Sequence, residues 1–127
     1  MPSAKSKFKI LLAEDDTTLG VMYRVKLEND GYEVTLVENG SDALKQATEN
    51  KFDLVMLDII MPQLDGFSVL KALKENVQTK KIPVIMLTNL GTEEDKVKGV
   101  KLGAADYLIK SSLTPEQVSE TINKLLS

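Results

Sequence analysis

The sequence predicts an α/β fold, a doubly wound five-stranded parallel sheet with five helices. Five short apolar runs alternate with segments in which apolar residues recur at helical spacing. Each run and its following helix take about 20–25 residues, the length of a compact βα unit. The runs are almost continuously apolar, as strands are when helices cover both faces of a parallel sheet.

The first predicted strand is residues 8–13 (FKILLA), a short apolar run. A helix should follow, because four apolar residues recur near helical spacing, namely Leu19, Met22, Val25 and Leu27. Gly31 is suited to end this helix, since glycine readily adopts the left-handed conformation found after helix C-termini.

The second predicted strand is residues 33–37 (EVTLV). Ser41 can cap the next helix, whose apolar face carries Ala43, Leu44 and Ala47. Residues 53–57 form the third strand. The dipeptide Asp65-Gly66 opens a third helix, whose apolar side is Phe67, Leu70 and Leu73.

The fourth predicted strand is residues 83–87 (PVIML), and its proline suits a first strand position. Thr92 can cap a helix that ends at Gly103, and residues 105–109 (ADYLI) form the fifth strand. The last helix has a strong start signal, because Thr114, Pro115 and Gln117 supply a cap, a first-turn proline and a capping-box partner. Its predicted buried face is Val118, Ile122 and Leu125.

Composition limits what the chain can do. A length of 127 residues fits one domain, which we place at residues 8–127 behind a flexible arm at residues 1–7. The net charge of -3 argues against direct nucleic-acid binding. With no cysteine and no histidine, the chain has neither disulfides nor imidazole chemistry of its own. No secretory signal or membrane-spanning run is visible, so we expect a cytoplasmic protein that does not contact membranes.

Polar residues follow four of the predicted strands. In an open parallel sheet, ligands bind beyond the carboxyl ends of the strands. The side chains expected at that rim are Glu14, Asp15, Asp16, Asp58, Thr88 and Lys110. Clustered carboxylates repel one another, and Lys110 alone cannot neutralise them. Oxygen ligands of this kind suit Mg²⁺, and a carboxylate beside Mg²⁺ can accept a phosphoryl group without help from histidine.

Four motifs extend this interpretation. They are AEDD (residues 13–16), LDIIMPQLDG (57–66), LTN (87–89) and DYLIK (106–110). In order and spacing they resemble the receiver domain of bacterial two-component response regulators, including the chemotaxis regulators, over nearly the whole chain after the arm. The resemblance implies the flavodoxin-like strand order 2-1-3-4-5.

The resemblance also implies a function, a signalling switch activated when Asp58 accepts a phosphoryl group from a histidine kinase or a histidine phosphotransfer protein. It would not be an enzyme in the usual sense, because it would catalyse only its own phosphorylation and slow dephosphorylation. Mg²⁺ would be held by Glu14, Asp15, Asp58 and the backbone carbonyl of Ile60, while Asp16 caps a helix. Thr88 and Lys110 would contact the phosphoryl oxygens, and Tyr107 would turn inward as Thr88 moves.

Partner surfaces follow from the same resemblance. The kinase would dock beside Leu19, Met22 and residues 111–113. The output protein, whose identity the sequence does not give, would meet the face formed by the fourth helix, fifth strand and fifth helix. We expect a monomer, with phosphorylation-dependent dimerisation as the alternative. The fourth helix should be loosely held, because it contains Gly99 and few apolar anchors, namely Val97, Val100 and Leu102.

The chain departs from the family pattern at two positions. Ser111 replaces the proline that usually follows the lysine in a cis bond, so this bond could be trans and the reach of Lys110 altered. Asn89 replaces the usual alanine or glycine after the threonine, where it could crowd the phosphoryl group or hydrogen-bond it. Ile60 and Leu90 are apolar where the family tunes hydrolysis, which predicts slow self-dephosphorylation.

Two other functions stay open at this stage. One is a receiver-like interaction scaffold that acts without phosphorylation, although the acceptor and the lysine are both retained. The other is a haloacid-dehalogenase-like phosphatase, which also forms an aspartyl phosphate. That class needs a second acid two residues after the nucleophile, where this chain has Ile60. Neither GxGxxG nor GxxxxGK[ST] is present, which disfavours nucleotide-binding folds.

Overall fold

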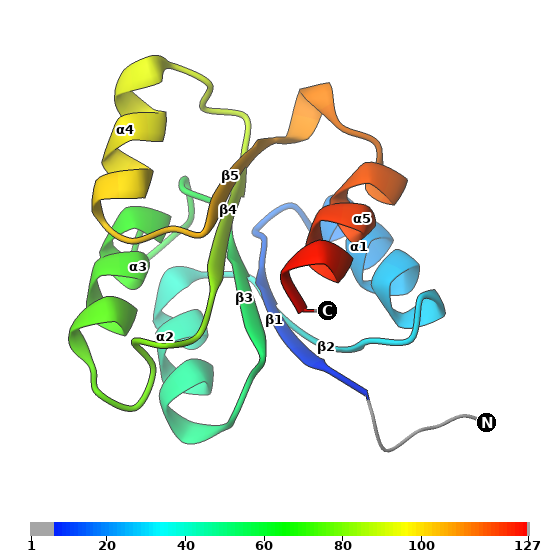
Figure 1. Cartoon of the computed structure of the whole chain (residues 1–127), viewed down its shortest axis with the longest axis horizontal. Helices are drawn as coiled ribbons and strands as arrows, with labels where there is room; N and C mark the ends of the chain where they lie inside the picture. The colour runs from blue at the N-terminus through cyan, green and yellow to red at the C-terminus, as the bar shows by residue number, and fades with distance from the viewer. Residues whose placement is uncertain (1–6, 127) are drawn as a thin grey trace.

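A central parallel sheet organises residues 7–126, the part of the chain that this computed structural model describes (Figure 1). The strand order is β2-β1-β3-β4-β5, as the resemblance implied. From one edge to the other the strands are β2 (Glu33–Val37), β1 (Lys9–Ala13), β3 (Leu54–Leu57), β4 (Val84–Thr88) and β5 (Asp106–Ile109). The predicted α/β doubly wound fold is therefore confirmed. Most of the predicted arm lies outside the described residues, so the domain limits stay a prediction.

Helices cover both faces of the sheet. On one face lie α1 (Thr17–Asn29) and α5 (Pro115–Leu126). On the other lie α2 (Gly40–Glu49), α3 (Gly66–Glu75) and α4 (Glu93–Lys101) (Figure 1). A short 3₁₀ turn, η2 (Lys110–Ser112), joins β5 to α5. Among residues 7–126, no helix combines the length and apolar character that crossing a bilayer requires.

The core has one layer on each side of the sheet. Side chains alternate along a strand, so Leu54 and Met56 pack with α1 and α5, while Val55 and Leu57 pack with α2 and α3. All four are completely buried. Burial on both faces explains why the central strands β3 and β4 are almost continuously apolar in the sequence.

Several predicted helix boundaries are confirmed. The backbone at Gly31 has φ 101°, as the stop after α1 requires. Asp65 and Thr92 accept hydrogen bonds from the backbone at the start of α3 and α4. Thr114 and Gln117 form the reciprocal bonds of a capping box before α5. The prediction for α2 is wrong, because the helix begins two residues earlier than a cap at Ser41 implies, and Asn39 caps it.

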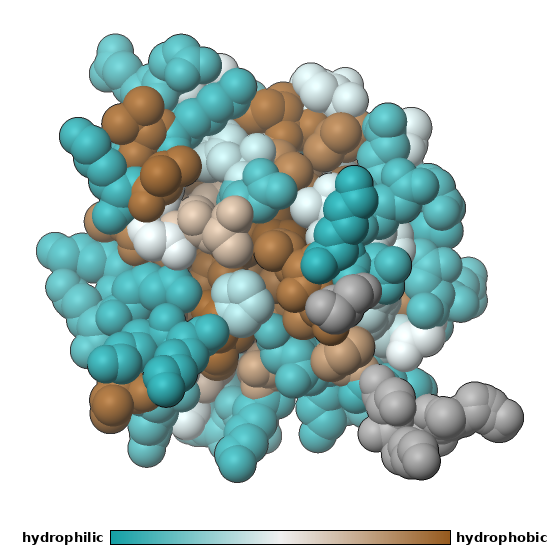
Figure 2. Space-filling view, in the orientation of Figure 1, coloured by the Kyte–Doolittle hydropathy of each residue, from teal (hydrophilic) through white to brown (hydrophobic). Residues whose placement is uncertain are grey.

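The predicted buried faces of three helices need correction. In α1, Met22 and Val25 are exposed, and the buried residues are Gly20, Tyr23 and Leu27. Leu125 of α5 is exposed too. In α4, Val97 and Val100 point to solvent, with exposed fractions of 46% and 65%, and the buried residue is Gly99. Apolar surface is visible over α4 in Figure 2. Of the three expected anchors of α4, Val97 and Val100 therefore do not anchor it, whereas Leu102, at the C-cap of the helix, packs against the core.

Candidate functional site

The register of the sheet brings the acidic residues together. Ala13 and Leu57 are the last residues of β1 and β3, and they pair directly. The next residues, Glu14 and Asp58, therefore emerge side by side, and the backbone N–H of Asp58 donates to the carbonyl of Ala13 at 3.1 Å. Thr88 and Ile109 pair in the same way at the ends of β4 and β5, so Lys110 leaves the sheet beside them.

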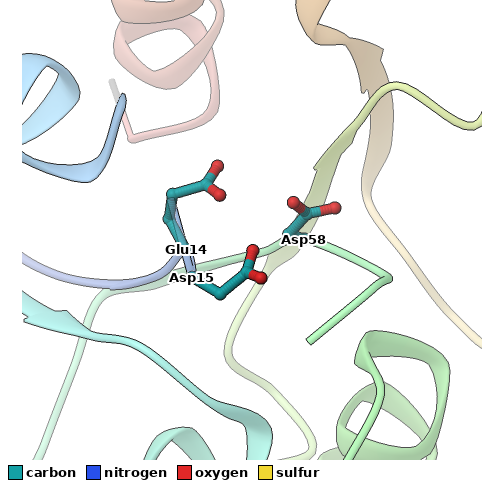
Figure 3. Close-up of side chains that lie close together, drawn as sticks. All are labelled: Glu14, Asp15 and Asp58. Atoms are coloured by element: carbon teal, nitrogen blue, oxygen red, sulfur yellow. The ribbon is translucent and has the colours of Figure 1, made fainter. Parts of the chain in front are cut away.

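Three carboxylates converge at this rim. An oxygen of each of Glu14, Asp15 and Asp58 lies within 4.8 Å of the others (Figure 3). Glu14 and Asp58 are buried, with exposed fractions of 2% and 8%, whereas Asp15 is exposed. Asp16 belongs elsewhere, because its carboxylate accepts from the N–H of Leu19 and caps α1 as predicted.

Lys110 reaches into the acidic cluster. Its Nζ donates to Asp58 Oδ2 at 2.6 Å and forms an ion pair with Glu14 Oε1. Burial acts to lower the pKa of Lys110, but the hydrogen bonds to Asp58 and Glu14 outweigh it and the pKa is raised. The ammonium group therefore remains charged, and a single positive charge faces three acids.

Of the buried acids, Glu14 has a carboxyl group that burial destabilises in its charged form. Burial raises the pKa of Glu14, although its bonds to Lys110 and to the N–H of Asp16 oppose the shift. A raised pKa in a carboxyl group means that its charged form is under-stabilised, so a further cation would be favourable. Three hard oxygen donors with net negative charge are a set that fits a divalent ion such as Mg²⁺.

The β3–α3 loop holds Asp58 in place. Its carboxylate Oδ1 accepts from the N–H of Ile59 at 2.6 Å. Gly66 returns to this point, since its N–H donates to the carbonyl of Ile59, and a Cβ on Gly66 would lie 2.1 Å from the carbonyl oxygen of Asp58. Glycine is therefore required at position 66. Within the loop, Gln63 has φ 70°, a left-handed conformation that is uncommon for a residue with a side chain.

A shallow pocket of about 330 Å³ opens over these groups. Thr88 lines it from the end of β4, is 1% exposed, and accepts from the N–H of Leu90. Ile60 also lines the pocket and is 64% exposed. The complete lining is Glu14, Asp15, Asp16, Leu19, Asp58, Ile60, Thr88, Asn89, Leu90 and Lys110. The site is thus an acidic cup, open to solvent, with a hydroxyl and an ammonium on its walls.

Tyr107 is outside the lining of this pocket. Its hydroxyl donates to the carbonyl of Leu90 at 2.6 Å, so the side chain is tied to the β4–α4 loop. Its ring packs on α4, because a Cβ on Gly99 would lie 3.0 Å from Tyr107 Cδ2. Burial, with the charges of Asp95 and Asp58, raises the pKa of Tyr107 to about 12. The residue therefore connects the loop after Thr88 with α4.

The two departures from the family pattern meet in space. The side-chain oxygen of Asn89 accepts from the backbone N–H of Ser111 at 3.0 Å. The Lys110–Ser111 bond is trans. The sequence marked both positions as unusual but gave no sign that they are bonded to each other. One feature of the sequence could have indicated this contact. Asn89 follows Thr88 and Ser111 follows Lys110, and these two candidate site residues stand at the ends of neighbouring strands.

Comparisons with known proteins agree with this geometry. The family model described as the response regulator receiver domain matches residues 10–123. PilH of Pseudomonas aeruginosa is 39% identical, over 94% of this chain and 98% of its own length. PhoP of Bacillus subtilis, a transcriptional regulator of alkaline phosphatase synthesis, is 38% identical over 93% of this chain. This chain spans about half of PhoP, 48%.

Solved structures of response regulator proteins have the same fold as this chain. The chemotaxis protein CheY4 of Vibrio cholerae superimposes with a TM-score of 0.88 and 32% identity, covering 95% of this chain and all (100%) of that one. The receiver domain of the Francisella response regulator 1452 gives a TM-score of 0.87 and 34% identity, covering 94% and 97% of the two chains.

Proposed function

Because this chain belongs to the response regulator receiver domain family of two-component signalling, we propose that Asp58 is its phosphoacceptor and that phosphorylation there switches the protein on. One observation carries the assignment. Asp58 is the acid at the centre of the site, since it is bonded to Lys110 and stands with Glu14 and Asp15 in a pocket that also holds Thr88.

The proposed reaction is a direct transfer from a phosphohistidine. An oxygen of the Asp58 carboxylate forms a bond to phosphorus while the bond from phosphorus to the imidazole nitrogen breaks. The products are an acyl phosphate and a free histidine, whose nitrogen is protonated from solvent. The phosphoryl donor is a histidine kinase or a histidine phosphotransfer protein. Such a step depends on positioning and charge neutralisation, which explains how a chain without histidine can carry it out.

Mg²⁺ is the proposed cofactor. Glu14, Asp15 and Asp58 would hold it, with the backbone carbonyl of Ile60 as a further ligand. When bound, it would neutralise charge on the carboxylates and on the phosphoryl group. We expect Mg²⁺ alone to raise the melting temperature, since a ligand of the folded state at 100 times its Kd stabilises by about 2.7 kcal/mol. Asp15→Asn is the matched control, because it removes an exposed ligand without disturbing the core.

The remaining groups would act after transfer. Lys110, already bonded to Asp58, would contact a phosphoryl oxygen, and Thr88 would move toward another. The loop after Thr88 would then take Tyr107 with it, because the tyrosine hydroxyl is bonded to Leu90. The output face is formed by α4, β5 and α5. We propose that it meets a protein partner, without direct contact to nucleic acid.

The test of the proposal is incubation with acetyl phosphate, with and without Mg²⁺, followed by intact mass measurement. We expect one phosphoryl adduct, dependent on Mg²⁺ and lost in Asp58→Asn. A wild-type protein that stays unmodified, or an Asp58→Asn variant that is modified equally, would contradict the assignment.

The phosphoryl group should be long-lived. Ile60 and Leu90 line the pocket beside Asp58, and neither side chain can orient an attacking water. We therefore expect slow loss of the adduct from purified protein with Mg²⁺ after the donor is removed. A half-life of only seconds would be the opposite result. Ile60→Asn and Leu90→Glu should shorten the half-life, since each puts a polar group at the pocket.

A further inference from the structure

A hydrogen bond between two loops supports the residue next to Lys110. Asn89 follows Thr88 in the β4–α4 loop, and Ser111 follows Lys110 in η2. The bond joins Asn89 Oδ1 to the N–H of Ser111 at 3.0 Å. Because a backbone N–H can only donate, the amide oxygen of Asn89 must face it, which fixes the orientation of the side chain.

The turn that carries Lys110 has little other support. η2 has no side-chain cap, and its own hydrogen bond, from the N–H of Leu113 to the carbonyl of Lys110, is long at 3.5 Å. Within residues 7–126, Asn89 supplies the one side-chain hydrogen bond to the backbone of this turn. The Lys110 side chain extends from this weakly held backbone to Asp58 and Glu14.

We propose that Asn89 is a positioning residue for Lys110. By accepting the N–H of Ser111, it fixes the backbone from which the lysine reaches the phosphoacceptor; this inference rests on the proposed function. Proline at position 111 would have no N–H to donate, so the bond requires a residue other than proline there as well as the asparagine. The two unusual residues then act as a pair, and Asn89 acts through Lys110 without touching the reacting atoms.

The first experiment tests the bond in metal-free protein by amide hydrogen exchange at Ser111. We expect slow exchange in the wild type and faster exchange in Asn89→Ala, while Asn89→Asp, which keeps an acceptor of the same shape, restores protection. Equal exchange at Ser111 in the wild type and Asn89→Ala would overturn the proposal. This readout requires neither Mg²⁺ nor phosphorylation.

The second experiment tests the consequence for transfer, with acetyl phosphate at saturating Mg²⁺. Losing one hydrogen bond that aligns Lys110 should lower the maximal phosphorylation rate of Asn89→Ala about threefold to fivefold. The Mg²⁺ concentration at half-maximal rate should not change, because Glu14, Asp15 and Asp58 are untouched. A shift in Mg²⁺ dependence with an unchanged maximal rate would assign Asn89 to the metal site and overturn the proposal.

The decisive comparison uses a Lys110→Ala background. If Asn89 acts through the lysine, Asn89→Ala slows phosphorylation of the wild type but adds nothing to Lys110→Ala. The same slowing in both backgrounds would overturn the proposal, because Asn89 would then act independently of Lys110. A different result would contradict the proposed function alone. In that case the wild-type protein accepts no phosphoryl group, although the amide of Ser111 is still protected from exchange.

Discussion

Helices α5 and α4 lie on opposite faces of the sheet near its β5 edge, and they are attached in different ways (Figure 1). In α5, Val118 and Ile122 are completely buried. The same helix is bonded to α1, because the hydroxyl of Ser119 donates to Asp30 and Lys26 pairs with Glu116 across the two helices. Apolar burial and polar contacts together fix α5 to the sheet.

Helix α4 buries a glycine and little else. Gly99 lies against the ring of Tyr107, and Lys98 lies over the ring of Phe67 with its Nζ 4.6 Å from the centroid. Val97 and Val100 are exposed. The contrast teaches that the proposed output face combines a fixed helix with a weakly held one. If Asp58 is the phosphoacceptor, as proposed, its phosphorylation would need to shift only α4, as a change in population between two states.

The largest expected effect comes from a matched pair of core and surface truncations. Ile122→Ala should lower the free energy of unfolding by about 2–4 kcal/mol, because it empties a buried position in α5. Val97→Ala in α4 should change it by about 0.5 kcal/mol or less. Urea unfolding measures both. Similar losses in the two variants would remove the contrast between the helices.

A second substitution tests the contact that holds α4. Gly99→Leu has no room against Tyr107, so the helix must move away or distort, at a cost of about 1–3 kcal/mol. The better helix propensity of leucine offsets about 1 kcal/mol of this. Val100→Leu is the control, because position 100 faces solvent. Unchanged stability and unchanged amide exchange of α4 in Gly99→Leu would show that the glycine contact does not hold the helix.

Phosphorylation should act on the two helices unequally. With Mg²⁺ and beryllofluoride as the phosphoryl mimic, we expect amide exchange in α4 to change several-fold while exchange in the buried turns of α5 stays nearly constant. The reason is that Thr88 and Leu90 connect the site to α4 through Tyr107. Asp58→Asn with the same additions is the control. Identical exchange in the free and beryllofluoride forms would count against the model of a loosely held α4.

The smallest effect is a pH dependence specific to the α1–α5 contact. The hydroxyl of Ser119 and the ammonium of Lys26 lower the pKa of Asp30 below its ordinary value. A carboxyl with a lowered pKa contributes stability above the unfolded pKa, and this is lost as pH falls below about 4. Between pH 6 and pH 3, the melting temperature should therefore fall slightly more in the wild type than in Asp30→Asn. A fall of equal size in both would mean that Asp30 contributes nothing.

Strands and strand ends were the most predictable parts of the molecule. The predicted strand 33–37 coincides with β2, and the other predicted strands begin or end within one residue of the observed ones. Parallel strands that helices cover on both faces are apolar on both, so the limits of the central strands are visible in the sequence. The carboxyl ends of parallel strands meet at one rim, so Glu14, Asp58, Thr88 and Lys110 could be placed together before any coordinates were known.

Helix faces and loop contacts were less predictable. Apolar spacing alone does not identify which face of a helix packs on the sheet. The spacing in α1 predicted that Met22 and Val25 point inward, whereas Gly20 and Tyr23 are the buried residues. Glycine has no side chain whose apolar character would predict burial, and the buried residue of α4 is Gly99. Asn89 and Ser111 are 22 positions apart, and their bond depends on how two loops leave neighbouring strands. No local pattern contains that information.

The bond from Tyr107 uses only the backbone carbonyl of Leu90, a residue that also lines the pocket and packs against the core. Under the proposed function, Leu90 would serve two purposes with separate atoms. Its main chain would transmit motion to Tyr107, and its side chain would govern how long the phosphoryl group persists. Substitutions at position 90 should therefore reset the duration of the response without weakening its transmission, so this protein offers an independent adjustment of timing for engineered signalling circuits.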